Sequence, residues 1–417
     1  IDGLAAAGMS FPRAYAACPV CSPTRAALVT GRHPARVGIT NFIGGERRGR
    51  LLQADYLRAL PEQEVTVPEL LQRAGYATGC FGKWHLGPPA LVRRHGFDTV
   101  GSNDVAPGKG PAHDPMHALA IAAQASSFIE SHQGRPWFCY VPLHSVHVPL
   151  AARAELVAAE TQRLAALPRH DGPREVPEGP RMARAVQDLP VYAAMIRELD
   201  ETVARVLAVL ERTGQVQDTL VVFTSDNGGL VTAEGSPTSN LPLRAGKGYL
   251  YEGGIRVPLV VRWPAVVAPA TTADVPVTTL DIAATLLDVG GCTLPAGHVL
   301  DGTSLRPVLG GTGPLPLRDL VWHFPHYGNQ GGRPAGAMIA GDSMEKVVEH
   351  FEDGRVELFD LAADPGERRD LAAERPERTR ELEARLAAWR ERVGARMPTA
   401  NPQPVEPYGP EGLPAKR

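Results

Sequence analysis

The chain has 417 residues, with 43 Lys and Arg against 46 Asp and Glu, so its formal net charge is −3. This near-neutral balance excludes the strongly basic surface of a dedicated nucleic-acid-binding protein. The 43% of hydrophobic residues suits a folded core, and no apolar run approaches the roughly 18 residues of a membrane helix. Lysine is rare, so a lysine inside a motif is informative; the five are Lys83, Lys109, Lys247, Lys346 and Lys416.

A short helix is predicted directly after Cys21. Ser22 is expected as its N-cap, Pro23 suits its first turn, and Gly31 ends it. The Cys21 thiol would then lie beside free backbone N–H groups at the positive end of the helix, where a thiol pKa falls and anions bind. The alternative is a small buried cysteine that only precedes a helix.

Strands and helices are predicted to alternate through the middle of the chain. Three apolar runs are expected as strands buried on both faces of a sheet: residues 137–141, 219–224 and 257–262. Apolar residues recur at helical spacing from Ile196 to Leu210, and Gly214 suits the end of that helix. This alternation indicates a layered α/β domain with a mostly parallel sheet and ligands beyond the strand ends, and the Pro-rich segment 150–190 is expected to be an insertion.

The sequence changes in character after about residue 310. Residues 321–324 and 356–359 are predicted strands, and a helix is predicted from Pro376 to near Gly394. We therefore expect an α/β domain over residues 1–310 and a smaller α+β subdomain over residues 311–417. The subdomain would contain a small antiparallel sheet, this helix and a Pro-rich tail from Pro398.

Two of the rare lysines lie in glycine-rich motifs. Lys83 and His85 are two residues apart, so on a strand or tight turn both side chains would point the same way and could meet one oxyanion. The alternative for this pair is a solvated lysine and a structural histidine. Lys247 precedes the run Glu252 to Pro258, and a compact ammonium suits a crowded anion pocket.

Polar residues also follow two of the predicted strands. His147 comes shortly after the first of them, where a hydrogen-bonded structural histidine is the alternative. Asp226 and Asn227 follow the second strand, and their carboxylate and amide oxygens are hard ligands suited to Ca²⁺ or Mg²⁺. The alternative for this pair is an ordinary Asp-Asn-Gly turn.

In chain order these motifs resemble those of the type I sulfatases. The similar segments are C-x-P-x-R at Cys21 to Arg25, G-K-W-H-L-G at Gly82 to Gly87, H-x-P at His147 to Pro149, G-K-x-x-x-x-E-G-G-x-R-x-P at Gly246 to Pro258, and E-L-Y-D-L-x-x-D-P-x-E at Glu357 to Glu367. The resemblance covers residues 1 to about 397. It implies an alkaline-phosphatase-like three-layer α/β sandwich and an arylsulfatase-like sulfuric ester hydrolase.

The resemblance also implies roles for single residues. In the family a formylglycine-generating or radical maturation enzyme oxidises the signature cysteine to Cα-formylglycine, which implies that fate for Cys21. Asp226, Asn227 and the modified Cys21 would bind Ca²⁺, with Mg²⁺ as a further possibility. The resemblance also implies that one hydroxyl of the hydrated formylglycine attacks the sulfur atom.

The remaining motif residues would act on the sulfate group. Arg25 would hold the attacking hydroxyl and the metal region, and Lys83 and Lys247 would bind the sulfate oxygens. His147, with Lys247, would assist the leaving group. His85 would then deprotonate the second hydroxyl and expel sulfate.

Two departures from the family leave alternatives open. Family members begin with a strand ending in two aspartates that bind the metal, whereas this chain starts after that position and Asp2 does not match it. We therefore expect an N-terminally truncated domain with a gap in its sheet, and an inactive fragment is one alternative. A phosphonate monoester or phosphodiester hydrolase of the same superfamily is another. Residues 340–345 also depart from the family's R-x-G-D-x-K-L pattern, so no substrate contacts are assigned to this segment.

By analogy with bacterial relatives, a sulfated carbohydrate is the preferred substrate and a periplasmic or secreted location is expected. A cluster in the C-terminal subdomain could line a sugar pocket or simply stack on a strand: His323, Phe324, His326, Tyr327 and Arg333. Ser102 and His113 are further pocket candidates. The sequence indicates no oligomeric state.

Overall fold

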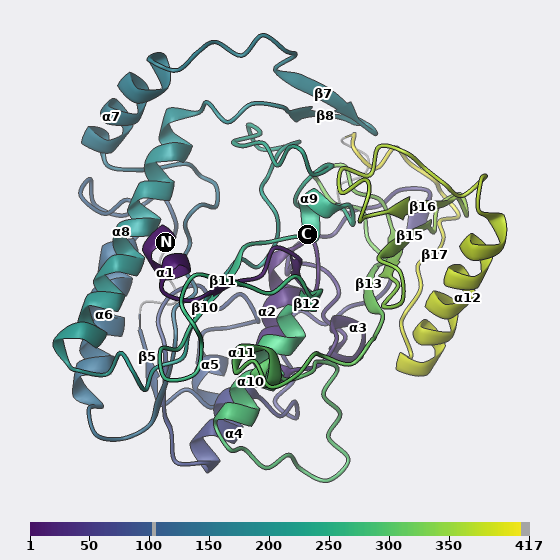
Figure 1. The fold of residues 1–417 in the computed structure, drawn as a ribbon. Coiled ribbons are helices and arrows are strands. Elements are labelled where there is room, and N and C mark those ends of the chain that lie inside the picture. The colour runs from purple at the N-terminus through teal and green to yellow at the C-terminus, as the bar shows by residue number, and fades with distance from the viewer. Residues whose placement is uncertain (102–105, 410–417) are drawn as a thin grey trace.

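The computed structural model describes residues 1–101 and 106–409 (Figure 1). Its helices are α1 (Asp2–Ala6), α2 (Cys21–Thr30), α3 (Pro34–Val37), α4 (Val67–Arg73), α5 (Ala90–Arg94), α6 (Ala118–Ser131), α7 (Ala154–Ala165), α8 (Pro190–Arg212), α9 (Glu252–Ile255), α10 (Thr279–Val289), α11 (Arg306–Leu309) and α12 (Pro376–Val393). Among these described helices, none is both long and apolar enough to cross a membrane.

The strands are short and form six separate sheets. They are β1 (Met9–Ser10), β2 (Ala14–Tyr15), β3 (Leu51–Leu52), β4 (Ala77–Cys80), β5 (Thr99–Val100), β6 (Trp137–Tyr140), β7 (Glu175–Glu178), β8 (Arg181–Arg184), β9 (Val221–Thr224), β10 (Leu259–Arg262), β11 (Thr271–Thr272), β12 (Val277–Thr278), β13 (Leu320–Phe324), β14 (Ala335–Ile339), β15 (Glu345–His350), β16 (Val356–Asp360) and β17 (Thr399–Ala400).

The predicted layered α/β fold is confirmed, and β6 shows how its layers arise. Alternate side chains of a strand point to opposite faces of the sheet. Trp137 and Cys139 pack with apolar residues of α6 and α8, whereas Phe138 packs with apolar residues of α4 and α10. A continuous apolar strand is therefore covered by helices on both faces, as its composition indicates.

The strand directions are mixed rather than mostly parallel. β4 runs parallel to β5 and β6, but β10 runs antiparallel to both β1 and β9. The strands β6, β9 and β10 all lie inside their predicted ranges. The helix predicted from Ile196 begins earlier, at Pro190. Proline is compatible with this start because the first turn of a helix does not need the backbone N–H that proline lacks.

Helix α2 begins at Cys21 rather than after a Ser22 cap. Its N-cap is Val20, which makes no side-chain cap hydrogen bond. The Ser22 hydroxyl instead accepts a hydrogen bond from the backbone N–H of Ile43 at 3.2 Å, so it is not available to cap the helix. Gly31 ends the helix with φ 68°, as predicted, because glycine adopts this left-handed conformation without strain.

The segment 150–190 forms α7 and the hairpin β7–β8, and the chain after residue 310 forms the antiparallel sheet β13-β14-β15-β16, against which α12 packs. Of these strands, β14 and β15 were not predicted. One buried apolar cluster joins this sheet to the α/β part: Trp322 and Phe359 pack with Tyr15, Val20 and other residues. The Trp322 indole donates a hydrogen bond to the backbone carbonyl of Ala16 at 2.8 Å. The C-terminal sheet thus supports the chain segment that leads into α2.

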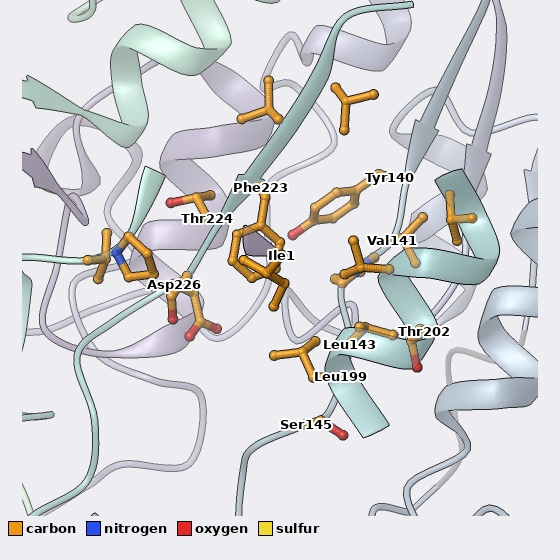
Figure 2. A pocket seen from close by; sticks show the side chains of 18 of the residues that line it. Ile1, Tyr140, Val141, Leu143, Ser145, Leu199, Thr202, Phe223, Thr224 and Asp226 are labelled. Carbon is orange, nitrogen blue, oxygen red and sulfur yellow. The ribbon is translucent and has the colours of Figure 1, made fainter. Parts of the chain in front are cut away.

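The edges of β6 and β9 border one large cavity. Each is the outermost strand of its sheet, and each is only half-buried although its side chains are largely apolar. A cavity of about 1620 Å³ lies along both edges, with Tyr140, Phe223 and Leu199 among its lining residues (Figure 2). The cavity is therefore lined by the open edges of two separate sheets.

Three buried histidines lie where the C-terminal sheet meets the α/β part. His33 Nε2 lies 3.0 Å from the Val321 carbonyl, His323 Nε2 lies 2.9 Å from the Arg396 carbonyl, and His326 Nε2 lies 2.8 Å from Thr40 Oγ1. Burial lowers the pKa of His33 and of His323 to about 4, and burial also lowers the pKa of His326. The folded protein therefore holds all three imidazoles neutral at neutral pH.

We expect acid to destabilise this junction. A histidine in the unfolded chain takes up a proton near pH ~6.5, whereas His323 in the folded protein does so only near pH ~4. The folded state therefore has its full stability above about pH 6.5 and loses stability as the pH falls from about 6.5 to about 4. The free energy of unfolding should fall by about 2 kcal/mol for each of His33 and His323 between about pH 6.5 and about pH 5. Urea unfolding of the wild type and of His323→Gln at both pH values measures this. An equal loss in the two proteins would contradict it.

Candidate active site

Cys21 lies at the first position of α2 and is the point on which the other polar motifs converge. Its side chain is buried, and the Lys83 ammonium approaches the thiol, with Nζ 3.8 Å from Sγ. Burial alone would raise the pKa of this thiol, but Lys247, Lys83 and hydrogen bonds from His147 and His85 together lower the pKa well below its usual value. The site therefore stabilises negative charge at the Cys21 side chain.

Lys83 and His85 lie in the loop that follows β4. The Lys83 backbone N–H donates to the Pro142 carbonyl at 2.7 Å, which ties this loop to the end of β6. Gly82 has φ 126°, and a Cβ there would lie 2.2 Å from the Pro142 oxygen, so only glycine allows this approach. Burial lowers the pKa of Lys83, and His85 Nδ1 is buried without a partner among the described residues.

His147 follows β6, as predicted, and its ring is oriented by the backbone. Nδ1 lies 2.6 Å from the Val148 carbonyl, so Nδ1 carries a proton there and Nε2 is left for the Cys21 side chain. His147 is only partly buried, in contrast to Cys21. It therefore lies on the more open side of the site.

Lys247 reaches the site from a loop held by close backbone contacts. Its N–H donates to the Gly229 carbonyl at 3.0 Å, and its side chain is buried. A Cβ on Gly246 would lie 2.3 Å from the Gly229 oxygen. The loop of Lys247 and the turn after β9 are therefore packed backbone to backbone.

Arg25 and Asp226 form the one anion–cation pair within this group of residues. Arg25 Nε and NH2 lie 2.8 Å and 2.7 Å from Asp226 Oδ2, and Arg25 NH1 donates to the Lys83 carbonyl at 2.7 Å. Arg25 therefore joins α2, the Lys83 loop and the turn after β9. Its guanidinium binds Asp226, one of the two predicted metal ligands, and its charge also acts on the Cys21 thiol.

The oxygen donors beside Arg25 match the chemistry of a hard cation. Asn227 Oδ1 is buried and has no hydrogen-bond partner in residues 1–101 and 106–409, and its Nδ2 donates to the Gly228 carbonyl at 2.9 Å. Asp226 lies next to it and lines the large cavity (Figure 2). An unpartnered amide oxygen beside a carboxylate fits Ca²⁺ or Mg²⁺, although the described residues contain no group of three or more His, Cys, Asp and Glu placed to hold a metal ion.

His144 is a buried polar residue at this site that the sequence motifs did not indicate. Burial, and then the charges of Lys83 and Arg25, lower its pKa to about 4, and its Nε2 is buried without a partner in the described part of the chain. It lines the same cavity as Lys83 and Asp226. Its only sequence signal is its position three residues before His147.

Other predicted pocket residues lie elsewhere. Ser102 is outside the described residues, and His113 is exposed. His323, Phe324, His326 and Tyr327 are buried in the junction with the C-terminal sheet, and Arg333 pairs with Glu352. The stacked-strand alternative therefore fits His323, Phe324, His326 and Tyr327, whose side chains fill the core, whereas Arg333 is exposed and lines a smaller surface pocket.

Comparisons with known proteins agree with these motifs. The family model described as Sulfatase matches residues 1–292, and the model described as N-sulphoglucosamine sulphohydrolase, C-terminal, matches residues 245–392. Steryl-sulfatase of Mus musculus is 30% identical, with 92% of this chain and 76% of that protein covered. N-acetylgalactosamine-6-sulfatase of Mus musculus is 27% identical, with coverage of 89% and 76%.

Solved structures share the fold. One is a protein solved in complex with its substrate, D-glucosamine-2-N,6-O-disulfate, at a TM-score of 0.75 and 20% identity. The match covers 94% of this chain and 92% of that chain. The likeness therefore extends through the C-terminal sheet as well as the α/β part.

The electrostatics of the site can be tested on the unmodified thiol. Replacing Lys83→Met removes an ammonium beside Cys21, so the thiol pKa should rise and the pH profile of its alkylation by iodoacetamide should move up by about one unit or more. Peptide mass spectrometry resolves Cys21 from the other cysteines. Arg205→Met, on the exposed side of α8, is the charge-matched control, and an unshifted profile in Lys83→Met would contradict the assignment.

Proposed function

The chain belongs to the sulfatase family and is a sulfuric ester hydrolase, and we propose that it uses formylglycine formed from Cys21 to cleave the ester. The observation that carries this proposal is the convergence of four side chains on one atom. Lys83, Lys247, His85 and His147 all act on the Cys21 side chain and favour negative charge there. That is the arrangement required where an anionic sulfate group meets a nucleophile.

Formylglycine, when hydrated, would supply two hydroxyl groups on one carbon, one to attack sulfur and one whose deprotonation later expels sulfate. The chain's own residues prepare both steps. Lys83 and Lys247 neutralise charge on the non-bridging sulfate oxygens, and because Lys247 is buried and Lys83 is partly buried, their charges are less screened than at the surface. The transition state, whose charge spreads over these oxygens, is thereby stabilised.

The two histidines handle protons on opposite sides of the reaction. His147 donates a proton from Nε2 to the ester oxygen as the S–O bond breaks, because its Nδ1 is held by the Val148 carbonyl. His85 would accept the proton of the second hydroxyl, which would let sulfate leave. Through water, His147 would regain the proton that the attacking hydroxyl loses, and His85 would release the proton that it took.

We propose that Asp226, Asn227 and the modified residue 21 hold a Ca²⁺ ion, which would supply positive charge beside the nucleophile. Two side-chain oxygens are fewer than the about six to eight ligands that Ca²⁺ takes. The cavity along β6 and β9 reaches Asp226, which leaves space there for further oxygen ligands. Arg25 fixes Asp226 Oδ2 and leaves Oδ1 for the ion.

We propose a sulfated carbohydrate as the substrate. The support is similarity to N-acetylgalactosamine-6-sulfatase, together with the shared fold of the protein solved with a glucosamine disulfate. A periplasmic or secreted location is part of the same proposal. A separate maturation enzyme would act on Cys21 as its partner.

The nucleophile is tested by replacing Cys21→Ala in protein coexpressed with a formylglycine-generating enzyme. Hydrolysis of p-nitrophenyl sulfate should fall by about 1,000-fold or more, because no nucleophile remains. Cys292→Ala, a partly buried cysteine without contact to the site, is the control. Peptide mass spectrometry should show formylglycine at position 21. Unchanged turnover in Cys21→Ala, or faster hydrolysis of a p-nitrophenyl phosphodiester than of the sulfate, would refute the proposal.

The metal is tested by chelation. Treatment with EDTA should lower turnover, and added Ca²⁺ should restore it. Asn227→Ala removes the unpartnered amide oxygen, so the Ca²⁺ concentration for half-maximal activity should rise by about tenfold or more. Asn401→Ala, in the C-terminal tail, should leave that concentration unchanged. Insensitivity of the fully metal-free protein to Ca²⁺ would contradict the assignment.

A further inference from the structure

A second group of charges is buried behind the active site. Lys346 and Glu252 have fully buried side chains, and Lys346 Nζ lies 3.1 Å from Glu252 Oε1 and 2.8 Å from Glu367 Oε1. Glu367 Oε2 accepts a hydrogen bond from the Glu252 backbone N–H at 2.6 Å. One ammonium thus joins two carboxylates that are 115 residues apart in sequence.

These charges come from both parts of the molecule. Lys346 lies on β15 and Glu367 follows β16, so both belong to the C-terminal sheet region, whereas Glu252 begins α9 just after the Lys247 loop. Burying three charges has a large desolvation cost, and apolar residues of similar size would often give equal stability. A contribution to stability therefore does not explain why these three residues are charged. The hydrogen bonds that join them to the active-site loops indicate a role in positioning those loops.

The first connection runs to the nucleophile. Tyr15 donates a hydrogen bond from its hydroxyl to Glu252 Oε2 at 3.0 Å, and the Ala16 N–H donates to the Ile255 carbonyl at 2.7 Å. This segment continues directly into Cys21 and α2. A displacement of Glu252 would therefore move the start of α2.

The second connection runs to the metal-binding turn and to Lys247. Gly228 donates its N–H to the Gly254 carbonyl at 2.9 Å, and Gly253 donates to the Arg244 carbonyl at 2.8 Å. A Cβ on Gly228 would lie 1.8 Å from the Gly253 oxygen, so these backbones are in direct contact. Helix α9 thus touches both the turn of Asp226 and the loop that carries Lys247.

We propose that Lys346 is a positioning residue of the active site: by fixing Glu252 and Glu367 it holds α9, and α9 aligns the Cys21 segment, the Lys247 loop and the Asp226 turn. This role rests on the proposed function for its effect on turnover. Lys346 itself touches no reacting atom. Its effect on catalysis is therefore expected in kcat and not in substrate affinity alone, because an error of about 1 Å in alignment can cost about 100-fold in rate.

The test compares variants that separate alignment from charge balance. Lys346→Met leaves Glu367 without its cation and leaves Glu252 with only the more distant Arg256, at 3.6 Å, so it should lower both kcat and the melting temperature. Lys346→Met combined with Glu367→Gln removes one of those negative charges and should regain much of the melting temperature, but the bridge stays broken. We expect kcat of the double variant to remain about 10-fold to 100-fold below wild type in matured protein.

Arg390→Met is the matched control. Arg390 pairs with Glu349 of the same strand β15 at 2.6 Å but has no contact with α9 or its loops. It should lower the melting temperature and leave kcat unchanged. Wild-type kcat in folded Lys346→Met, or full recovery of kcat in the double variant, would overturn the proposal.

A second readout does not depend on turnover. In unmodified protein, the midpoint of the pH profile for alkylation of Cys21 by iodoacetamide should move up by about one unit or more in the double variant, because Lys247 no longer lies beside the thiol. If matured wild-type protein cleaves no sulfate ester, the proposed function fails, and this pH profile still tests the role of Lys346. An unshifted profile in a folded double variant would overturn that role.

Discussion

The active site depends on holding several positive charges close together in a protein that is otherwise near neutral. Lys83, Lys247 and Arg25 surround one buried point, and like charges in a weakly screened interior repel each other. Asp226 pairs with Arg25, and the anionic form of the Cys21 side chain balances part of the remaining charge. The remaining repulsion between these side chains has to be balanced by the folded backbone. A lysine on a mobile loop would move away from the other cations, so the loops that carry Lys83 and Lys247 must be fixed.

Backbone contacts between loops provide that fixation. The Lys83 loop is bound to the end of β6, the Lys247 loop is bound to the turn after β9, and glycines bring these backbones closer than any Cβ would permit. The buried Lys346 cluster adds a contact from the C-terminal sheet to the same loops. The cations are therefore positioned by a continuous set of short backbone contacts and not by the lengths of their side chains.

The sequence predicted the site better than the fold around it. Lys83, His85 and Lys247 stand in glycine-rich motifs, where glycine marks close backbone approach, whereas Cys21 and His147 were indicated by the resemblance to the sulfatase motifs. By contrast, β14 has the composition Ala-Gly-Ala-Met-Ile and β15 begins with Glu-Lys, and neither composition is typical of a strand. Their pairing is decided by long-range packing against α12 and the α/β part, which local pattern does not contain.

The same limit applies to single residues. Lys346 was visible as a rare lysine, but nothing near it in sequence indicated the two carboxylates that it bridges. Ser22 has the chemistry of a cap, yet its hydroxyl binds the Ile43 backbone, a contact that only tertiary structure creates. His144 was passed over because a second histidine stood nearby in a motif. In each case the deciding partner is distant in the chain.

The junction between Trp322 and the Ala16 carbonyl also has a consequence for the order of events during synthesis. It joins two segments 306 residues apart, so the segment around Cys21 leaves the ribosome long before the sheet that covers it exists. Until β13 to β16 emerge, this segment lacks the apolar neighbours that bury it in the finished protein. The Cys21 side chain is therefore accessible during synthesis, before β13 to β16 have formed, and becomes buried once the protein is complete.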